Sequence, residues 1–218
     1  MAIHKLLIAL MFLTSTAAYA KKGPKTPRIP SAEERKDKSY TIDAQPLTLY
    51  LGTVSAGFTQ GASVGTYLDS DLIARVTLRG GKSCLEERCS HVENSASFTL
   101  QKFVANTFFV EAGGMAQRSI YHMTEYDNGD WRYDQDYGYT YSAQTAGGTF
   151  ALGNQWQFGA FTLGVRWVQI YQAALSRESK VHADKDGRKV GKAQKDQLRK
   201  LEREFKLYLP SLALGFSF

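Results

Sequence analysis

The sequence predicts an all-β protein: an eight-stranded antiparallel up-and-down transmembrane β-barrel with a short helix in its last extracellular loop. Three observations lead to this prediction. The chain starts with an export signal, continues in alternating apolar runs joined by polar turns, and ends on an alternating aromatic strand. The last strand places small residues on one face and large apolar residues on the other. These large residues are Leu212, Leu214, Phe216 and Phe218.

Residues 1–20 have the composition of a secretory signal peptide. Lys5 supplies the positive region, residues 6–13 form the apolar region, and Ala18, Tyr19 and Ala20 form a cleavage site, so cleavage is expected after Ala20. The apolar run is shorter than the roughly 20 residues that a transmembrane helix needs. An exported chain without a later apolar run of that length is either a soluble protein or a β-barrel. We expect the protein to be located in the bacterial outer membrane.

Charge is distributed unevenly along the chain. Residues 21–38 contain seven basic and three acidic residues, and residues 176–206 contain eleven basic and six acidic residues. The net charge of +6 therefore comes from two appendages, and no nucleic-acid partner is expected. Residues 21–44, which include three prolines, are predicted to form a disordered basic periplasmic tail.

The barrel is expected to occupy residues 45–218 and to consist of four hairpins. Tight turns are predicted at residues 69–71, 104–106 and 153–155, and longer polar loops at the opposite ends of the strands. Near Gly147 and Gly148 the apolar face changes parity, which a β-bulge would explain. The predicted strands cover residues 47–52, 58–68, 72–79, 96–101, 107–121, 138–152, 156–171 and 211–218.

Alternation of short turns with long loops is typical of transmembrane barrels. Four of the eight predicted strands, at residues 58–68, 107–121, 138–152 and 156–171, reach the roughly 9 to 11 residues that a tilted strand needs to cross a membrane. An even number of strands also returns both termini to the same side. A soluble lipocalin-like barrel or a β-sandwich would alternate in a similar way and stays the alternative.

The Leu-x-Leu-Gly-Phe-Ser-Phe ending, the tight turns and the strand count resemble the small outer-membrane β-barrels of the OmpA, OmpX and OmpW type. The resemblance covers roughly residues 45–218. It implies contact with outer-membrane lipid and lipopolysaccharide. It also implies recognition of the last strand by the barrel-assembly machinery, a signal carried by Leu212, Leu214, Phe216 and Phe218.

If the apolar faces contact lipid, several charged residues on the opposite faces point into the lumen. An eight-stranded barrel is narrow enough for side chains to fill, so Glu111 is expected to pair with one or two of the arginines. Such charges either form an ionic plug or line a gated passage. The predicted lumen charges are Arg75, Arg79, Glu111 and Arg166.

Cys84 and Cys89 lie in one short polar segment of an exported chain, so a disulfide is expected between them. His91 is the sole nearby candidate for a further ligand, so no metal site is predicted there. The acidic loop at residues 125–136 lacks the spacing of an EF-hand. We expect no metal and no cofactor.

Ser90, His91 and His122 lie near the loops, but sequence adjacency does not provide a base and an orienting group. No catalytic residues are therefore predicted. The chain also lacks a His-x-Ser-Asn run, the motif that a resemblance to the lipid A deacylases of this barrel type would imply.

The long charged loop, residues 172–205, is expected to contain a helix at residues 193–205. Leu198, Leu201 and Phe205 recur at helical spacing, which indicates an amphipathic helix. It could lie on lipid head groups, contact a partner protein or cap the barrel mouth. Its basic residues are Lys195, Arg199, Lys200 and Arg203.

These observations together favour a monomeric, non-enzymatic outer-membrane barrel with a structural or surface-interaction role, acting on an unidentified surface partner through its loops. A gated conduit for ions or small solutes is the first alternative. A lipid A-modifying enzyme is the second.

Overall fold

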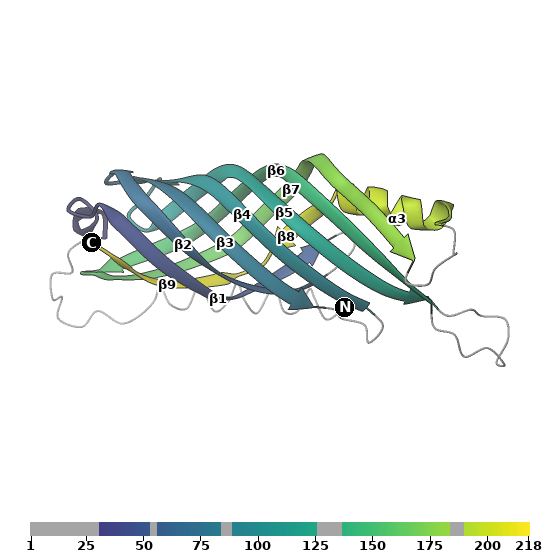
Figure 1. The fold of residues 1–218 in the computed structure, drawn as a ribbon. Helices are drawn as coiled ribbons and strands as arrows, with labels where there is room; N and C mark the ends of the chain where they lie inside the picture. The colour runs from purple at the N-terminus through teal and green to yellow at the C-terminus, as the bar shows by residue number, and fades with distance from the viewer. Residues whose placement is uncertain (1–30, 53–55, 84–88, 126–136, 184–189) are drawn as a thin grey trace, which may run out of the picture.

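The computed structural model describes residues 31–52, 56–83, 89–125, 137–183 and 190–218. Nine antiparallel strands form one sheet that closes on itself, because β1 pairs with β2 and β7 pairs with β9 (Figure 1). The strands are β1 (Tyr40–Gly52), β2 (Ala56–Asp69), β3 (Leu72–Ser83), β4 (Cys89–Phe103), β5 (Phe108–Glu125), β6 (Tyr137–Phe158), β7 (Phe161–Ala183), β8 (Phe205–Tyr208) and β9 (Ser211–Ser217).

The short strands β8 and β9 together form the eighth stave of the barrel. Both lie between β7 and β1, and Leu209 and Pro210 separate them. Proline has no N–H to donate to a strand ladder. On the edge of β1 that pairs with β2, Pro46 coincides with a register shift between Gln45 and Thr48. On its other edge, β1 pairs with β9 at residues 41–44 and with β8 at residues 50–52. The eight-stranded up-and-down barrel predicted from the sequence is thus confirmed, with an interrupted seam between its first and last staves.

The two ends of the barrel differ in their connections. At the short-turn end lie the turns at residues 70–71, 104–107 and 159–160, together with the carboxy terminus and the short helix α2 (Ser31–Glu34) (Figure 1). The two-residue turn before β7 uses Gly159 with a φ of 62°, a conformation that glycine adopts at no steric cost. The helix α3 (Lys192–Glu202) lies at the opposite, long-loop end.

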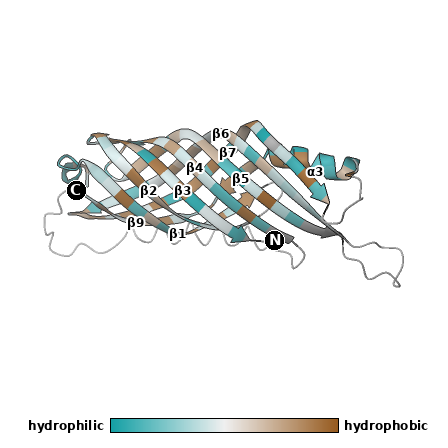
Figure 2. Cartoon of the chain, in the orientation of Figure 1, coloured by the Kyte–Doolittle hydropathy of each residue, from teal (hydrophilic) through white to brown (hydrophobic). Residues whose placement is uncertain are grey.

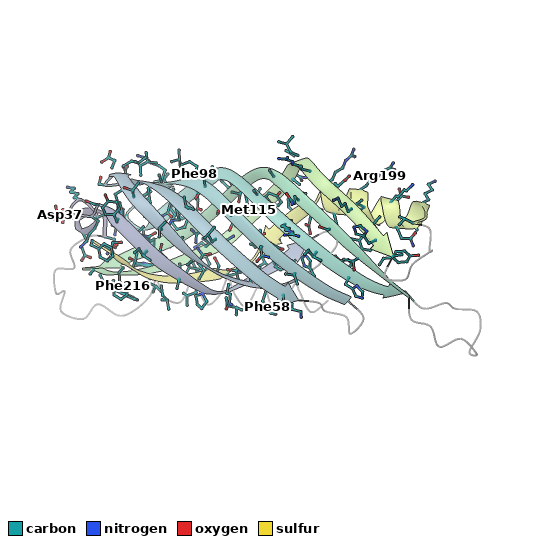
Figure 3. The ribbon with its side chains drawn as sticks, in the orientation of Figure 1. Asp37, Phe58, Phe98, Met115, Arg199 and Phe216 are labelled. Atoms are coloured by element: carbon teal, nitrogen blue, oxygen red, sulfur yellow. The ribbon has the colours of Figure 1, made fainter. Side chains whose placement is uncertain are left out.

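Polarity is inverted relative to a soluble protein, because the polar face of each strand points inward. Figure 2 shows hydrophobic and hydrophilic residues alternating along the strands, with a largely hydrophilic α3. Phe58, Phe98 and Phe216, labelled in Figure 3, are 49%, 58% and 56% exposed on the outer wall. Threonine, glutamine, serine and charged residues fill the buried interior. No helix among the described residues is long and apolar enough to cross a membrane.

The start of the barrel differs from the prediction. β1 begins at Tyr40, where residues 40–44 alternate between exposed and buried positions, and α2 precedes it. The expectation of a disordered tail is therefore wrong for residues 31–44. Ile42 and Asp43 continue the alternation of β1 toward the short-turn end. The predicted strand began only at residue 47, after Pro46, where the pairing with β2 shifts in register. Residues 1–30 lie outside the described residues.

The hairpin formed by β6 and β7 also differs from the prediction. Its turn lies at Gly159 and Ala160 rather than at residues 153–155. β6 keeps its odd-numbered residues inward along its length, and the register shift near Gly147 inserts Ala174 on β7 instead. Near the long-loop end of β6, the large apolar residues Tyr139 and Tyr141 face inward and are buried, while the outward residues of the same stretch are polar. The apolar residues therefore change faces along β6 although the strand itself keeps its parity.

Candidate functional site in the barrel lumen

The first group of lumen charges, the short-turn cluster, comprises Asp43, Arg75, Glu111 and Arg166. Arg75 on β3 donates through Nη1 to Asp43 Oδ2 on β1 and to Ser63 Oγ at 2.9 Å. Its Nη2 donates to Gln155 Oε1 on β6 at 3.3 Å. The guanidinium therefore connects its own strand β3 to three further staves, β1, β2 and β6, and its charge is matched by a carboxylate.

The second pair of this cluster lies on β5 and β7. Arg166 Nε donates to Glu111 Oε2 at 2.9 Å, and Thr99 Oγ1 donates to Glu111 Oε1 at 2.8 Å. Both charged side chains are 4% exposed. Breaking such a buried pair by removing one partner is costly, whereas the intact pair contributes little net stability. The pair therefore fixes the arrangement of β4, β5 and β7 around it.

The long-loop cluster comprises Glu93, Glu204 and Lys206. Lys206 on β8 contacts Glu93 Oε2 on β4 and lies 3.2 Å from Glu204 Oε2. Tyr208 donates its hydroxyl to Glu93 Oε1 at 3.0 Å, and Gln117 donates to Glu204 Oε2 at 2.9 Å. One fully buried ammonium group thus serves two carboxylates.

Arg79 is buried in the lumen, and its side chain donates to an amide rather than to a carboxylate. Its Nε donates to Gln45 Oε1 at 2.9 Å, and the guanidinium carbon lies 5.4 Å from the centre of the Tyr208 ring. Nη1 has no hydrogen-bond partner among the described residues. Gly61 makes room for this side chain, because a Cβ at that position would lie 2.7 Å from Arg79 Cγ.

An aromatic cluster, Tyr121, Tyr139 and Tyr141, lies at the long-loop end of the lumen. Leu201 of α3 packs against it and is 1% exposed, and Leu198 is partly buried there. Below it, the Tyr50 hydroxyl and His91 Nδ1 are 2.7 Å apart. The apolar side of α3 therefore covers the mouth, while Lys195, Arg199, Lys200 and Arg203 are exposed. Figure 3 shows Arg199 on this helix.

The segment around α2 covers the short-turn mouth. Arg35 is 1% exposed; it donates through Nε to Ser70 O at 3.1 Å and through Nη1 to Asn106 O at 2.9 Å. Its guanidinium lies 3.6 Å from the centre of the Phe103 ring. Glu34 Oε2 accepts from Gly159 N at 2.7 Å. The segment therefore contacts all three short turns.

Burial lowers the pKa of the Arg35 guanidinium, and the nearby Tyr67 and Asp71 oppose this shift. A hydrogen bond from Lys102 lowers the pKa of Asp71, which lies in the turn before β3. The Lys102 Nζ to Asp71 Oδ2 distance is 2.7 Å, and both side chains are substantially exposed.

All four predicted lumen charges face the interior. The structure brings Glu111 onto Arg166, pairs Arg75 with Asp43 and leaves Arg79 with an amide partner. The outward residues of the last strand are exposed on the barrel wall; these are Leu212, Leu214, Phe216 and Phe218. The proposed disulfide includes Cys84, which lies outside the described residues, as does most of the acidic loop at residues 126–136.

Sequence reasoning missed Arg35, Asp43, Glu93, Glu204 and Lys206. Glu93 has the same parity as Ser95 and Ser97, so extending the predicted strand at residues 96–101 backward would have placed it inside. Lys206 and Glu204 belong to a segment that the sequence reading included in or beside a loop. Nothing in a simple alternation marks these two residues as buried.

The described residues do not form a recognisable catalytic arrangement. His91 contacts Tyr50, and His122 Nδ1 lies 3.1 Å from Thr140 Oγ1 on the outward face. Within the described ranges, no group of three or more His, Cys, Asp or Glu side chains could hold a metal ion. The arrangement as a whole links the barrel staves through charges and covers both mouths.

A closed antiparallel barrel with an apolar outer wall and a polar, ion-paired lumen is a transmembrane β-barrel. This is the class of protein that the fold and its interior define.

No protein-family profile and no curated protein matched the sequence. Among solved structures, Acinetobacter baumannii CarO2 is 12% identical with a TM-score of 0.48, covering 82% of this chain and 99% of its own. The N-terminal β-barrel domain of Pseudomonas aeruginosa OprF is 12% identical with a TM-score of 0.36, covering 83% and 98%. The translocator domain of NalP from Neisseria meningitidis is 10% identical with a TM-score of 0.42, covering 100% and 97%.

Proposed function

We propose that this protein is a non-enzymatic outer-membrane β-barrel with a structural and surface-interaction role. The single observation that carries the proposal is the position of α3, whose apolar side packs on the aromatic cluster while its basic side is exposed. The barrel then serves as a rigid mount for a basic surface. The ion-paired lumen and the covered mouths support a scaffold rather than an open pore.

The predicted export signal and the aromatic last strand support the outer membrane as the location. In this location the short-turn end lies in the periplasm and the long-loop end outside the cell. The exposed residues of β9 and the terminal Phe218 would be read by the barrel-assembly machinery during insertion.

Binding of a polyanion tests the surface role. Proteoliposomes carrying the barrel should bind to heparin-coated beads, and Lys195→Glu/Lys200→Glu should abolish most of that binding, because it reverses two exposed charges on α3. Lys36→Glu/Lys38→Glu, at the opposite end, is the matched control and should bind like the wild type. Equal binding by all three proteins would contradict the proposal.

Protease treatment of intact cells tests the orientation. Trypsin should cut at Lys195, Arg199 and Lys200 without lysis, and cut near Lys36 only after lysis. Cleavage near Lys36 in intact cells, with α3 protected, would reverse the orientation.

A second candidate function, a gated conduit, is favoured by Arg79. Arg79 is 6% exposed, and its Nη1 lacks a hydrogen-bond partner among the described residues, so this level of the lumen would attract a small anion. Chloride release from loaded liposomes tests it. Release above that of protein-free liposomes, lost in Arg79→Gln, would support the conduit, and release equal to the protein-free control would exclude it.

A further inference from the structure

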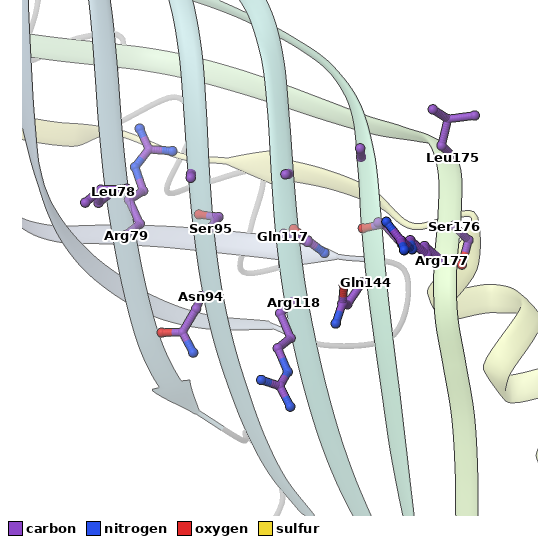
Figure 4. A pocket seen from close by; sticks show the side chains of 14 residues that line it. Leu78, Arg79, Asn94, Ser95, Gln117, Arg118, Gln144, Leu175, Ser176 and Arg177 are labelled. Carbon is purple, nitrogen blue, oxygen red and sulfur yellow. The ribbon is translucent and has the colours of Figure 1, made fainter.

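A groove of about 750 Å³ lies on the outer wall of the barrel, across β3, β4, β5, β6 and β7. Figure 4 shows the residues around it, with the basic side chains of Arg118 and Arg177 projecting from two of these strands. The proposed surface role of α3 does not use this groove, since α3 lies at the mouth.

The floor of the groove is one row of paired residues that face outward. Ala96, Ala116 and Ala146 lie side by side on β4, β5 and β6, because Ala96 pairs with Ala116 and Ala116 pairs with Ala146. At the two ends of the row, Leu78 and Leu175 are 60% and 71% exposed and form raised walls. Three alanine methyl groups between two leucine side chains therefore form an apolar trough that extends from β3 to β7.

Toward the short-turn end, the trough continues into the apolar outer wall. The next outward row contains Val76 and Phe98, followed by Gly114 and Gly148, which leave the wall thin at that point. Below that row lie Leu100 and Phe150, both exposed. An occupant of the trough therefore has an apolar part that enters the hydrocarbon region.

The rim of the groove toward the long-loop end is polar and basic. The row above the alanines holds Asn94, Arg118, Gln144 and Arg177, which pair in that order across four strands. Arg118 and Arg177 are exposed. Lys82 and Lys180 lie on the next outward row, also exposed. Glu178 and Ser179 fall in the register shift of β7 between these two rows, and the described residues that pair within the rows include no aspartate or glutamate.

We propose that this groove binds a phosphorylated glycolipid of the outer leaflet, with an acyl chain on the alanine floor and a phosphate between Arg118 and Arg177. Arginine matches phosphate in a bidentate geometry, and two arginines on one rim suit a headgroup with more than one negative oxygen. A free anion would leave the trough uncovered, and a neutral lipid would leave the basic rim unmatched. The inference rests on the proposed outer-membrane orientation, which places the rim in the outer leaflet.

Native mass spectrometry of the barrel in detergent tests the proposal with lipid A carrying two phosphates. We expect Arg118→Gln/Arg177→Gln to bind about tenfold more weakly than the wild type, because both phosphate contacts are removed. Lys36→Gln/Lys38→Gln removes the same charge at the opposite end of the barrel and should bind like the wild type. Ala116→Trp fills the trough and should weaken binding to a similar extent, whereas Ala112→Trp, two rows lower on the same face of β5, should not.

Dephosphorylated lipid A and phosphatidylglycerol complete the test, and both should bind the wild type about tenfold more weakly than the bisphosphorylated glycolipid. Equal binding by the wild type and the double arginine variant would overturn the proposal. So would an equal loss in the Lys36/Lys38 control, which would indicate unspecific attraction, or equal affinity for phosphatidylglycerol. Heat-modifiable migration of each variant shows whether it is folded. The trypsin test on intact cells reports the orientation separately, so a failure of the proposed function is distinguishable from a failure of this inference.

Discussion

The two halves of the lumen balance their charges in different ways. In the short-turn cluster each cation has its own carboxylate, and all four charged residues are on strands that pair over long stretches. In the long-loop cluster one lysine serves two carboxylates, and Lys206 and Glu204 come from the segment that returns from α3. The first half is held by sheet register, whereas the second depends on a loop returning to the barrel.

Because of this difference, the two halves of the lumen should respond differently to the loss of one charged side chain. Two separate pairs can lose one member and keep the other pair intact. A shared cation has no substitute, because its loss leaves two buried carboxylates that repel each other. The long-loop half should therefore be the more sensitive to single substitutions.

Lys206→Met should produce the largest effect. It leaves Glu93 and Glu204, both nearly inaccessible, without a counter-charge, and we expect a loss of about 4 kcal/mol in the free energy of unfolding. Urea unfolding in detergent micelles measures it.

The control for this prediction removes the carboxylates as well. Lys206→Met/Glu93→Gln/Glu204→Gln should recover most of the lost stability, since no uncompensated charge is left. A loss below about 1 kcal/mol in the single variant would show that the cluster is not desolvated as described.

Glu111→Gln should have the next largest effect, about 3 kcal/mol, because Arg166 stays buried without its carboxylate. The amide keeps the shape and can still accept from Thr99, which limits the loss. The double variant Glu111→Gln/Arg166→Gln should be more stable than the single variant in the same unfolding assay. If the double variant is the less stable of the two, the pair does not act as a unit.

Leu201→Ala should lower the stability of the mouth by about 2 kcal/mol, because Leu201 is the buried apolar residue of α3. The effect should be local: trypsin should cut α3 faster, while the global unfolding midpoint changes little. Leu198→Ala, at a partly buried position, should have a smaller effect on the cleavage rate. Unchanged cleavage in Leu201→Ala would mean that α3 is not held by this contact.

The smallest effect is expected at the exposed pair of Asp71 and Lys102. Its contribution at pH 7 should be below about 0.5 kcal/mol. The pKa of Asp71 is lowered by the hydrogen bond from Lys102, so the pair stabilises the fold above the ordinary pKa of aspartate and loses this contribution as the pH falls through the lowered value. Asp71→Asn should therefore differ from the wild type at pH 7 and match it in acid. A difference that persists in acid would contradict this assignment.

The comparison also explains what could be predicted from the sequence. Alternation placed Arg75, Arg79, Glu111 and Arg166 inside correctly, because each lies in a regular strand where parity determines the face. It failed at Asp43, beyond the Pro46 bulge, and at Lys206, beyond a helix, because parity is lost wherever the chain leaves the ladder.

Helical spacing located α3 within a few residues of its observed bounds. It did not show that Leu201 would meet the aromatic cluster, since that contact depends on where the loop returns. The position of the turn between β6 and β7 was also predicted wrongly. The prediction placed it at the polar residues 153–155, whereas the structure has a two-residue turn at Gly159 and Ala160.

Complementary charges and the two covered mouths should close the lumen, so that the barrel serves as a scaffold. Single-channel recording of the purified wild-type barrel in a planar bilayer shows whether the lumen is closed. We expect no discrete conductance steps from the wild type, and steps only when the ion-paired plug is broken, as in Lys206→Met. Regular openings of the wild type that are unchanged in Glu111→Gln and Lys206→Met would contradict it.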